Sequence, residues 1–412
     1  MKKILLIFLA VWLSACSNIS DFNDNPKAAT DVPAGTLFVN AQKNLADGMA
    51  ETNVNENIFR LLSQQWTQTT YIDESNYNLV TRTIPQQWWH RMYRDVLKDL
   101  DEAKRLVEAD DKLSASQKAT QIAMTEVLAV YAYSVLVGTF GDIPYSEALD
   151  FENLEPKYDD AATVHGALLT RLDAAIANLS GDAGDFATFD VFYAGDMAAW
   201  SMFANSLKLR LGMTLADVDA STAKSAVESA VSAGVFKSNA DNAAFGYLES
   251  TPNTNPIWVS IVQSGRKDYI GTDTFIDMLN NLDDPRRPMY YTTGPNGITF
   301  VGGPYGANNN FAAYSKPGAF ASEPTTEGLL MDYTEVEFYL AEAAARGMSV
   351  GGTAAEHYNK GITASMEYWG VADADIASYL AQSSVAYSTA QGDFKEKIGT
   401  QKWLALYNRG YE

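Results

Sequence analysis

The chain has 412 residues, a formal net charge of −21, three histidines and one cysteine. One cysteine excludes a disulfide framework and any multi-cysteine zinc or iron–sulfur site, and the strong acidity argues against nucleic acid, whose phosphates are bound through Lys and Arg. With 47% hydrophobic and 20% charged residues, the sequence is typical of a folded globular protein.

The first predicted element is a signal peptide over residues 1–15. Two lysines follow Met1, and residues 4–13 form an apolar run too short to cross a bilayer as a helix. Small residues then precede Cys16. This arrangement resembles the lipobox of bacterial lipoproteins, which implies acylation of Cys16, with palmitate among the acyl chains. A plain secretory signal with a chance cysteine is the alternative, and the position of the only cysteine favours the lipobox.

The next segment, residues 16–35, is polar and rich in turn residues, and is predicted to form a lipidated tether. Beyond it, apolar residues recur at helical spacing. Five helices are predicted, over residues 86–109, 116–137, 161–179, 196–216 and 222–233. The second is apolar almost all round toward its end, which is typical of a helix buried between neighbours.

The composition changes between residues 238 and 330, where eight of the 13 prolines and ten of the 28 glycines occur. Only a short helix near residues 275–282 and a short strand near 298–301 are predicted there. A stretch of this length is too long to be a simple connector in a compact domain. Residues 36–412 are therefore predicted to form one helical body, in which residues 238–330 are a loop-rich insert that carries part of the ligand surface.

Helical periodicity resumes after the insert. Helices are predicted over residues 333–347 and 355–369, joined by a short glycine turn. The pair has the length of a tetratricopeptide unit, and residues 86–137, earlier in the chain, form another predicted hairpin. Neither hairpin could bury its apolar face alone, so several must stack. The fold class predicted is mostly α, with tetratricopeptide-like helical hairpins and a large loop-rich irregular region.

Several short sequence segments, taken in the order in which they occur, resemble the SusD/RagB family of nutrient-binding outer-membrane lipoproteins of Bacteroidota. They are the Asp-Phe-Asn-Asp-Asn-Pro phrase at 21–26, the helix-end phrase at 136–148, Asp284-Pro285-Arg286, the helical phrase at 333–343, and Gln-Lys-Trp-Leu-Ala-Leu-Tyr at 401–407. In the family a further segment follows the last phrase, so we expect the sequence to be a C-terminally truncated fragment.

The resemblance implies a lipid-anchored, surface-exposed protein of the bacterial outer membrane. It implies capture of an oligosaccharide, or in some branches a peptide, for nutrient uptake through a SusC-like TonB-dependent transporter. It also implies that the protein is not an enzyme. A lipid-anchored glycoside hydrolase and a purely structural repeat scaffold remain as alternatives.

Motifs for catalysis or metal binding are absent from the sequence. His90, His165 and His357 are isolated, and no nucleophile elbow or phosphate-binding loop occurs. The window that begins Asp217-Val218-Asp219 superficially suits a calcium loop, but its sixth residue is Thr222 instead of glycine, so a capped helix start is predicted. No cofactor is predicted; calcium elsewhere stays open and unsupported.

Ligand-binding residues are predicted mainly among aromatic side chains in loops. Sugar C–H faces stack on aromatic rings while charged and amide side chains bond the hydroxyls, and loops carry binding residues more often than helices do. Five tryptophans lie in helical periods and are predicted to be core residues: Trp88, Trp89, Trp200, Trp369 and Trp403. The predicted ligand residues are Trp66, Tyr71, Asp73, Tyr77, Trp258, Arg266, Tyr305 and Tyr314.

Overall fold

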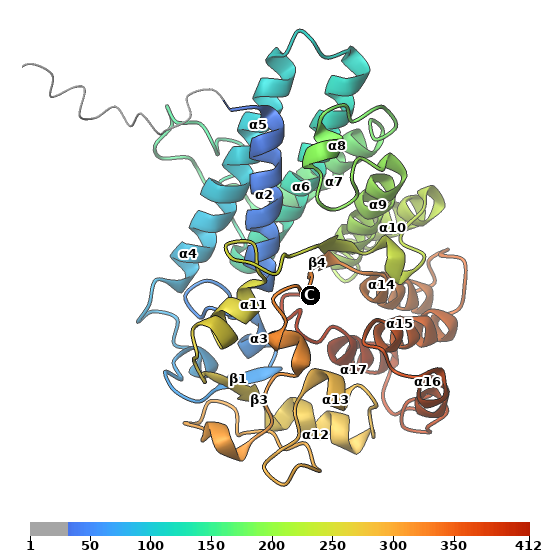
Figure 1. Cartoon of the computed structure of the whole chain (residues 1–412). Helices are drawn as coiled ribbons and strands as arrows, with labels where there is room; N and C mark the ends of the chain where they lie inside the picture. Colours follow the sequence, from blue (N-terminus) through green and yellow to red (C-terminus); the bar gives the residue numbers. More distant parts are fainter. Residues whose placement is uncertain (1–31) are drawn as a thin grey trace, which may run out of the picture. The chain divides into compact units, whose positions relative to one another are not determined.

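Helices supply most of the regular structure in the computed structural model, which describes residues 32–412 (Figure 1). The predicted signal peptide, Cys16 and most of the predicted tether lie outside the described residues. The first described helix, α2 (Ala34–Ala50), begins two residues inside the segment predicted as tether. Its apolar stripe of Phe38, Ala41, Leu45 and Met49 is buried. We did not predict this helix, because polar residues and glycines interrupt its pattern.

Residues 84–109 form one continuous helical segment that packs against α2. It consists of α4 (Ile84–His90), a π-helical stretch η3 (Arg91–Leu97) and α5 (Lys98–Ala109). Pro85 lies in the first turn, where its missing N–H leaves no hydrogen bond unmade. The chain then returns through α6 (Ala115–Phe140), so the predicted first hairpin is confirmed.

The helix α6 is the centre of the largest core. Ser114 and Gln117 cap its N-terminus reciprocally, which satisfies donors that the first turn leaves open. Within residues 32–412, α6 alone has the length and apolar composition of a membrane span, and most of that window is buried inside the protein as in a core helix.

Three longer helices follow: α7 (Ala161–Ile176), α9 (Met197–Thr214) and α10 (Ala220–Ala233). A short α8 (Phe186–Phe189) precedes α9. Each longer helix begins at an aspartate whose side chain accepts backbone N–H groups of the first turn. Asp219 accepts from the Thr222 amide at 3.0 Å, so the capped helix start predicted for the calcium-like window is confirmed.

The insert contains short elements and two antiparallel strand pairs, of which one ties it to β1 and the other joins its two ends. β3 (Tyr269–Gly271) pairs with β1 (Trp66–Gln68), and β2 (Ala243–Phe245) pairs with β4 (Gly328–Met331). Its helices are η4 (Asn239–Asp241), α11 (Pro256–Trp258), η5 (Val259–Gln263), α12 (Asp273–Asn281), α13 (Arg287–Tyr290), η6 (Phe311–Ala313) and η7 (Ala319–Ser322). Two further short helices lie near β1: α3 (Phe59–Leu62) and η2 (Glu74–Asn76).

The strand predicted near residues 298–301 is wrong. The Asn296 side chain accepts from the amides of Ile298 and Thr299, both at 3.0 Å, and the Gly294 amide donates to the Thr299 carbonyl at 2.7 Å. These bonds close a turn, and Ile298 is exposed. The apolar alternation that predicted a strand therefore has no sheet to join.

After the insert, α14 (Tyr333–Ala345) and α15 (Ala354–Tyr368) form the predicted second hairpin, and α16 (Asp373–Leu380) and α17 (Phe394–Ala405) follow. Gly347 and Gly351 in the connection have positive φ angles of 80° and 78°, which glycine adopts without steric cost. α17 packs against both helices of the hairpin (Figure 1). The predicted mostly α fold with tetratricopeptide-like hairpins is confirmed.

A second core joins three distant parts of the chain. We call this set the aromatic cluster: Leu61, Trp66, Phe275, Tyr290, Tyr291, Leu404 and Tyr407. The Tyr290 and Tyr407 rings stack at 4.2 Å between centroids, and Trp66 donates to the Tyr407 hydroxyl at 2.8 Å. The insert is thus built into the unit formed by residues 34–412.

Candidate functional site

Two exposed tyrosines mark a loop that directly follows β1. We call residues 69–78 the tyrosine loop. Tyr71 and Tyr77 are 66% and 60% exposed, and their φ angles are +55° and +59°. The left-handed conformation costs a residue with a β-carbon about 1–2 kcal/mol. Such strain persists only where surrounding contacts impose it, and it concentrates at functional sites.

The buried side chain of Gln68 imposes the shape of the tyrosine loop. Its amide nitrogen donates to the Tyr71 carbonyl at 2.8 Å and to the Glu74 carboxylate at 2.7 Å. Its amide oxygen accepts from the Ser75 amide at 3.2 Å and from the Ser75 hydroxyl at 2.9 Å. At the start of the loop, the Thr69 hydroxyl donates to the Lys267 carbonyl at 2.6 Å. The loop is therefore fixed from inside before any ligand arrives.

A groove of about 710 Å³ lies beside the tyrosine loop. We call it the Tyr71 groove; its lining residues come from segments 53–55, 71–82 and 259–269. It brings together three predicted ligand residues, Tyr71, Asp73 and Arg266. The Arg82 guanidinium, which we did not predict, lies 5.7 Å from the centroid of the Tyr71 ring and can hold that ring by a cation–π contact.

Charged side chains in the Tyr71 groove are paired locally. Arg82 lies 3.5 Å from the Asp73 carboxylate and 3.3 Å from the buried Glu74 carboxylate. Arg266 donates to the Asp268 carboxylate at 2.5 Å, and this contact raises the pKa of the Arg266 guanidinium. Arg82, Asp73 and Arg266 stay partly exposed, whereas Glu74 is buried, so the groove offers both donors and acceptors.

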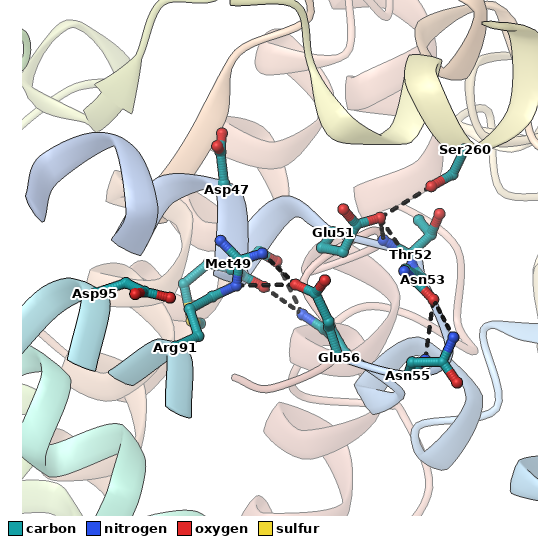
Figure 2. A network of polar contacts seen from close by, with 12 residues as sticks. Asp47, Met49, Glu51, Thr52, Asn53, Asn55, Glu56, Arg91, Asp95 and Ser260 are labelled. Atoms are coloured by element: carbon teal, nitrogen blue, oxygen red, sulfur yellow. Dashed lines mark hydrogen bonds and ion pairs between the residues drawn. The ribbon is translucent and has the colours of Figure 1, made fainter. Parts of the chain in front are cut away.

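A polar network supports the wall of the groove formed by residues 53–55 (Figure 2). The Glu51 carboxylate accepts from the amides of Thr52 and Asn53, both at 2.8 Å, and from the Ser260 hydroxyl at 2.9 Å. Burial raises the pKa of Glu51, although these bonds oppose the shift. Figure 2 shows Ser260 pointing toward Glu51 from the neighbouring segment. The network thus joins two walls of the Tyr71 groove.

Tyr77 and Tyr305 form a pair at the other end of the tyrosine loop. Their ring centroids are 6.2 Å apart. The Tyr305 hydroxyl donates to the Leu61 carbonyl at 2.8 Å, and the Asn76 side chain donates to the Gly306 carbonyl at 2.9 Å. Burial raises the pKa of Tyr305. Tyr305 therefore holds its position through the backbone and supports the more exposed Tyr77.

The remaining predicted ligand residues lie elsewhere. Trp66 is 1% exposed and is part of the aromatic cluster, so its prediction as a ligand residue is wrong. The polar sequence around Trp66 suggested a loop, whereas it belongs to β1 and is covered by Tyr269 and Tyr407. Trp258 and Tyr314 are half-buried and do not line the Tyr71 groove.

The groove also contains residues that sequence reasoning missed, above all Asn53, Asn55, Arg82 and Asp268. They are ordinary polar residues in irregular segments, and the only available signal was their place in polar loops. Only the folded chain shows that they share a groove with Tyr71.

Helical hairpins that support an irregular face with exposed tyrosines define a class of binding protein. The chain belongs to the SusD-like family described as starch-binding and associating with the outer membrane, whose model matches residues 26–412. A search of curated proteins found no match.

Solved structures with the same fold agree with this membership. A protein described as chitin-binding is 26% identical, with a TM-score of 0.77, and the alignment covers 92% of this chain and 85% of that one. A SusD homologue from Bacteroides uniformis is 27% identical, with a TM-score of 0.76 and the same coverage. A SusD-like protein from Bacteroides thetaiotaomicron is 25% identical, with a TM-score of 0.76 and again the same coverage.

Proposed function

We propose that the protein captures an oligosaccharide on the face formed by the tyrosine loop and the Tyr71 groove. The observation that carries the proposal is the presence of two exposed tyrosines, held in a strained backbone conformation, on one loop beside a polar groove. A protein that did not use these side chains would gain stability by losing the strain.

The chemistry of the groove suits a neutral, hydroxyl-rich ligand. The flat rings of Tyr71 and Tyr77 provide surfaces for the C–H faces of sugar rings. Asp73 and Arg266 provide the acceptor and donor that sugar hydroxyls need, and orient the ligand as a few polar groups do in most binding sites. Tyr305 acts by supporting Tyr77. Trp258 and Tyr314, which do not line the groove, have no part in this proposal.

The descriptions of the family and of one related structure suggest which ligands to test first. The family description names starch, and one relative of 26% identity is described as chitin-binding. Malto-oligosaccharides and chito-oligosaccharides therefore come first in a binding panel, followed by other plant and microbial glycans and by peptides.

The proposal places the protein at the outer membrane, lipid-anchored through Cys16 and exposed to the outside. There it would pass its ligand to a SusC-like TonB-dependent transporter without catalysis. The support is the family's association with the outer membrane and the lipobox-like sequence before Cys16. The transporter half is tested by co-purification of the full, lipidated chain from its native membrane; recovery of the chain without any transporter would overturn that half.

Calorimetry with the panel, using a chain that starts after Cys16, tests the glycan half. We expect at least one oligosaccharide to bind, the double variant Tyr71→Ala/Tyr77→Ala to lose that binding, and no sugar product to be released. Val80→Ala is the matched control, because Val80 is exposed just beyond the same loop and does not line the groove. Absence of binding to every glycan, or undiminished binding by the double variant, would contradict the proposal.

A further inference from the structure

A second hollow on the protein is lined by aromatic side chains and is separate in its residues from the Tyr71 groove. It encloses about 550 Å³ between residues 89–98 and the loop 144–158 that follows α6. We call it the Trp89 trough. None of the residues predicted as ligand-binding lines it.

The trough presents aromatic faces at close spacing. The Trp89 ring lies 4.7 Å from Tyr93 and 6.0 Å from Tyr158, measured between centroids. Phe151 and Tyr158 are 77% and 64% exposed. A cluster of exposed aromatic side chains rimmed by polar residues is a mark of a binding surface.

The loop that carries Phe151 and Tyr158 is held in place without a ligand. The Asp159 carboxylate accepts from the Ser146 amide at 2.7 Å and from the Tyr145 amide at 3.2 Å. Lys98 donates to the Leu149 carbonyl at 2.8 Å, and its ammonium group lies 4.4 Å from the centroid of the Phe151 ring. Leu149 itself has a φ of +67°, a strained value that these contacts impose.

The rim of the trough is polar. Arg94 forms a fork with Asp95, with distances of 2.6 Å and 2.8 Å. Its remaining terminal nitrogen has no hydrogen-bond partner among residues 32–412. Asp150 and Glu155 add carboxylates to the lining. The floor under Tyr93 and Arg94 is the π-helical stretch η3, a backbone form that is rare and frequent at functional sites.

We propose that the Trp89 trough is a second carbohydrate site, which stacks a sugar ring on Phe151 and Tyr158 and binds its hydroxyls through Arg94 and Glu155. The choice of a sugar rests on the proposed function and on the lining. Flat aromatic faces with charged groups at their edges match a ring that is apolar on its face and hydroxylated around its rim. An acyl chain has no hydroxyl groups that the charged side chains at the rim could bind.

Both sites take part of their lining from the same stretch of chain, residues 82–98. Arg82 of the Tyr71 groove lies two residues before α4, and Trp89 lies five residues into that helix, about 8 Å along its axis. A long glycan that fills both sites gains avidity without new contacts at either one. A glycan long enough to reach both sites is therefore expected to bind more tightly than a short one.

Calorimetry with hexasaccharides and disaccharides of the maltose and chitobiose series tests this inference. We expect Phe151→Ala/Tyr158→Ala to weaken hexasaccharide binding about tenfold or more, and to leave disaccharide binding at the Tyr71 groove unchanged. Leu154→Ala is the matched control, because Leu154 is exposed in the same loop and does not line the trough. Circular dichroism checks that each variant is folded.

The outcomes separate the two proposals. Unchanged hexasaccharide binding by Phe151→Ala/Tyr158→Ala would overturn the second site and leave the first intact. Loss of transporter binding by this variant, with glycan binding unchanged, would have the same consequence. If Tyr71→Ala/Tyr77→Ala binds hexasaccharides normally while the trough variant does not, the Tyr71 groove fails and the trough stands. A wild-type chain that binds no glycan overturns both.

Discussion

Two residues of the tyrosine loop combine a strained backbone with an exposed aromatic ring. The strained conformations of Tyr71 and Tyr77 depend on bonds made by Gln68, a residue that is buried and cannot touch a ligand. Substitutions can therefore test separately the exposed tyrosine rings and the Gln68 side chain that holds the loop.

Replacement of Tyr71 by Asn separates function from stability at this position. Asn tolerates the left-handed region better than tyrosine does, and the exposed cation–π contact with Arg82 is worth only about 0.5–1 kcal/mol. We expect the free energy of unfolding to stay within about 1 kcal/mol of wild type while glycan affinity falls. Urea denaturation and calorimetry measure the two effects. A large loss of stability would show that Tyr71 has a structural role.

Replacement of Gln68 by Ala tests whether this side chain holds the tyrosine loop in its conformation. The variant leaves the buried Glu74 carboxylate and the Ser75 hydroxyl without their partner. We expect the free energy of unfolding to fall by about 1–3 kcal/mol, because buried polar groups without partners are unfavourable. Glycan affinity should also fall although Gln68 contacts no ligand, and amide hydrogen exchange should accelerate over residues 69–78. Wild-type exchange in that loop would contradict the role assigned to Gln68.

At the scale of elements, helix packing depends on small residues at the crossings. A β-carbon on Gly361 of α15 would lie 3.0 Å from the Phe338 ring of α14, whereas one on Gly166 of α7 would meet nothing within 4 Å. We expect Gly361→Leu to destabilise the protein by about 1–3 kcal/mol through overpacking. Gly166→Ala, the control, should stabilise it by about 0.5–1 kcal/mol. Thermal unfolding of both variants checks the pair, and equal effects would refute this account of the crossing.

A buried charged group joins α9 to α14. Arg210 donates to both oxygens of Glu335, at 2.7 Å and 2.8 Å, and Arg409 lies 2.5 Å from the same carboxylate. Burial alone would raise the pKa of Glu335, but the two guanidinium groups outweigh it and lower the pKa to about 2. Because the folded-state pKa lies below the unfolded-state value of 4.5, the stabilisation is complete above pH 4.5 and is lost as the pH falls toward 2.

Glu335→Gln is expected to destabilise the protein by about 3 kcal/mol at neutral pH, since it removes the charge that two buried guanidinium groups share, while Asp332 stays 2.7 Å from Arg409. The variant should also lose part of the acid dependence that the wild type shows. Urea denaturation of both chains at several pH values measures this. Parallel stability curves below pH 4.5 would mean that Glu335 is not the titrating group.

At the scale of the whole molecule, the insert and the helical hairpins share one core. Phe275 of α12 packs against Trp403 and Tyr407, whose centroids lie 4.7 Å and 5.6 Å away. We expect a single unfolding transition, with circular dichroism and tryptophan fluorescence changing together. Phe275→Ala should lower the free energy of unfolding by about 3–5 kcal/mol and move both signals equally. Two separate transitions would show that the insert unfolds on its own.

Sequence periodicity predicted the long helices because their apolar faces repeat locally. It failed for α2, whose stripe is short, and for the strand near residues 298–301, since pairing depends on a partner that lies far away in sequence. Trp66 illustrates the same limit within the site. Its neighbours are polar, and it is buried by contacts with Tyr269 and Tyr407, which lie more than 200 residues later in the sequence. Tyr71, Asp73 and Arg266 could be predicted as loop residues, but their shared groove could not.

The contact between residues 60–66 and residues 406–408 also affects the order of events in biogenesis. Arg60 donates to the Asn408 side chain at 2.7 Å, and the Gln65 side chain accepts from the Asn408 amide at 2.9 Å. The ribosome makes these partners more than 300 residues after β1, so β1 and the loop that follows it lack their support until the end of α17 has emerged. A nascent chain is therefore expected to fix the conformation of the tyrosine loop only after residues 406–408 have emerged from the ribosome.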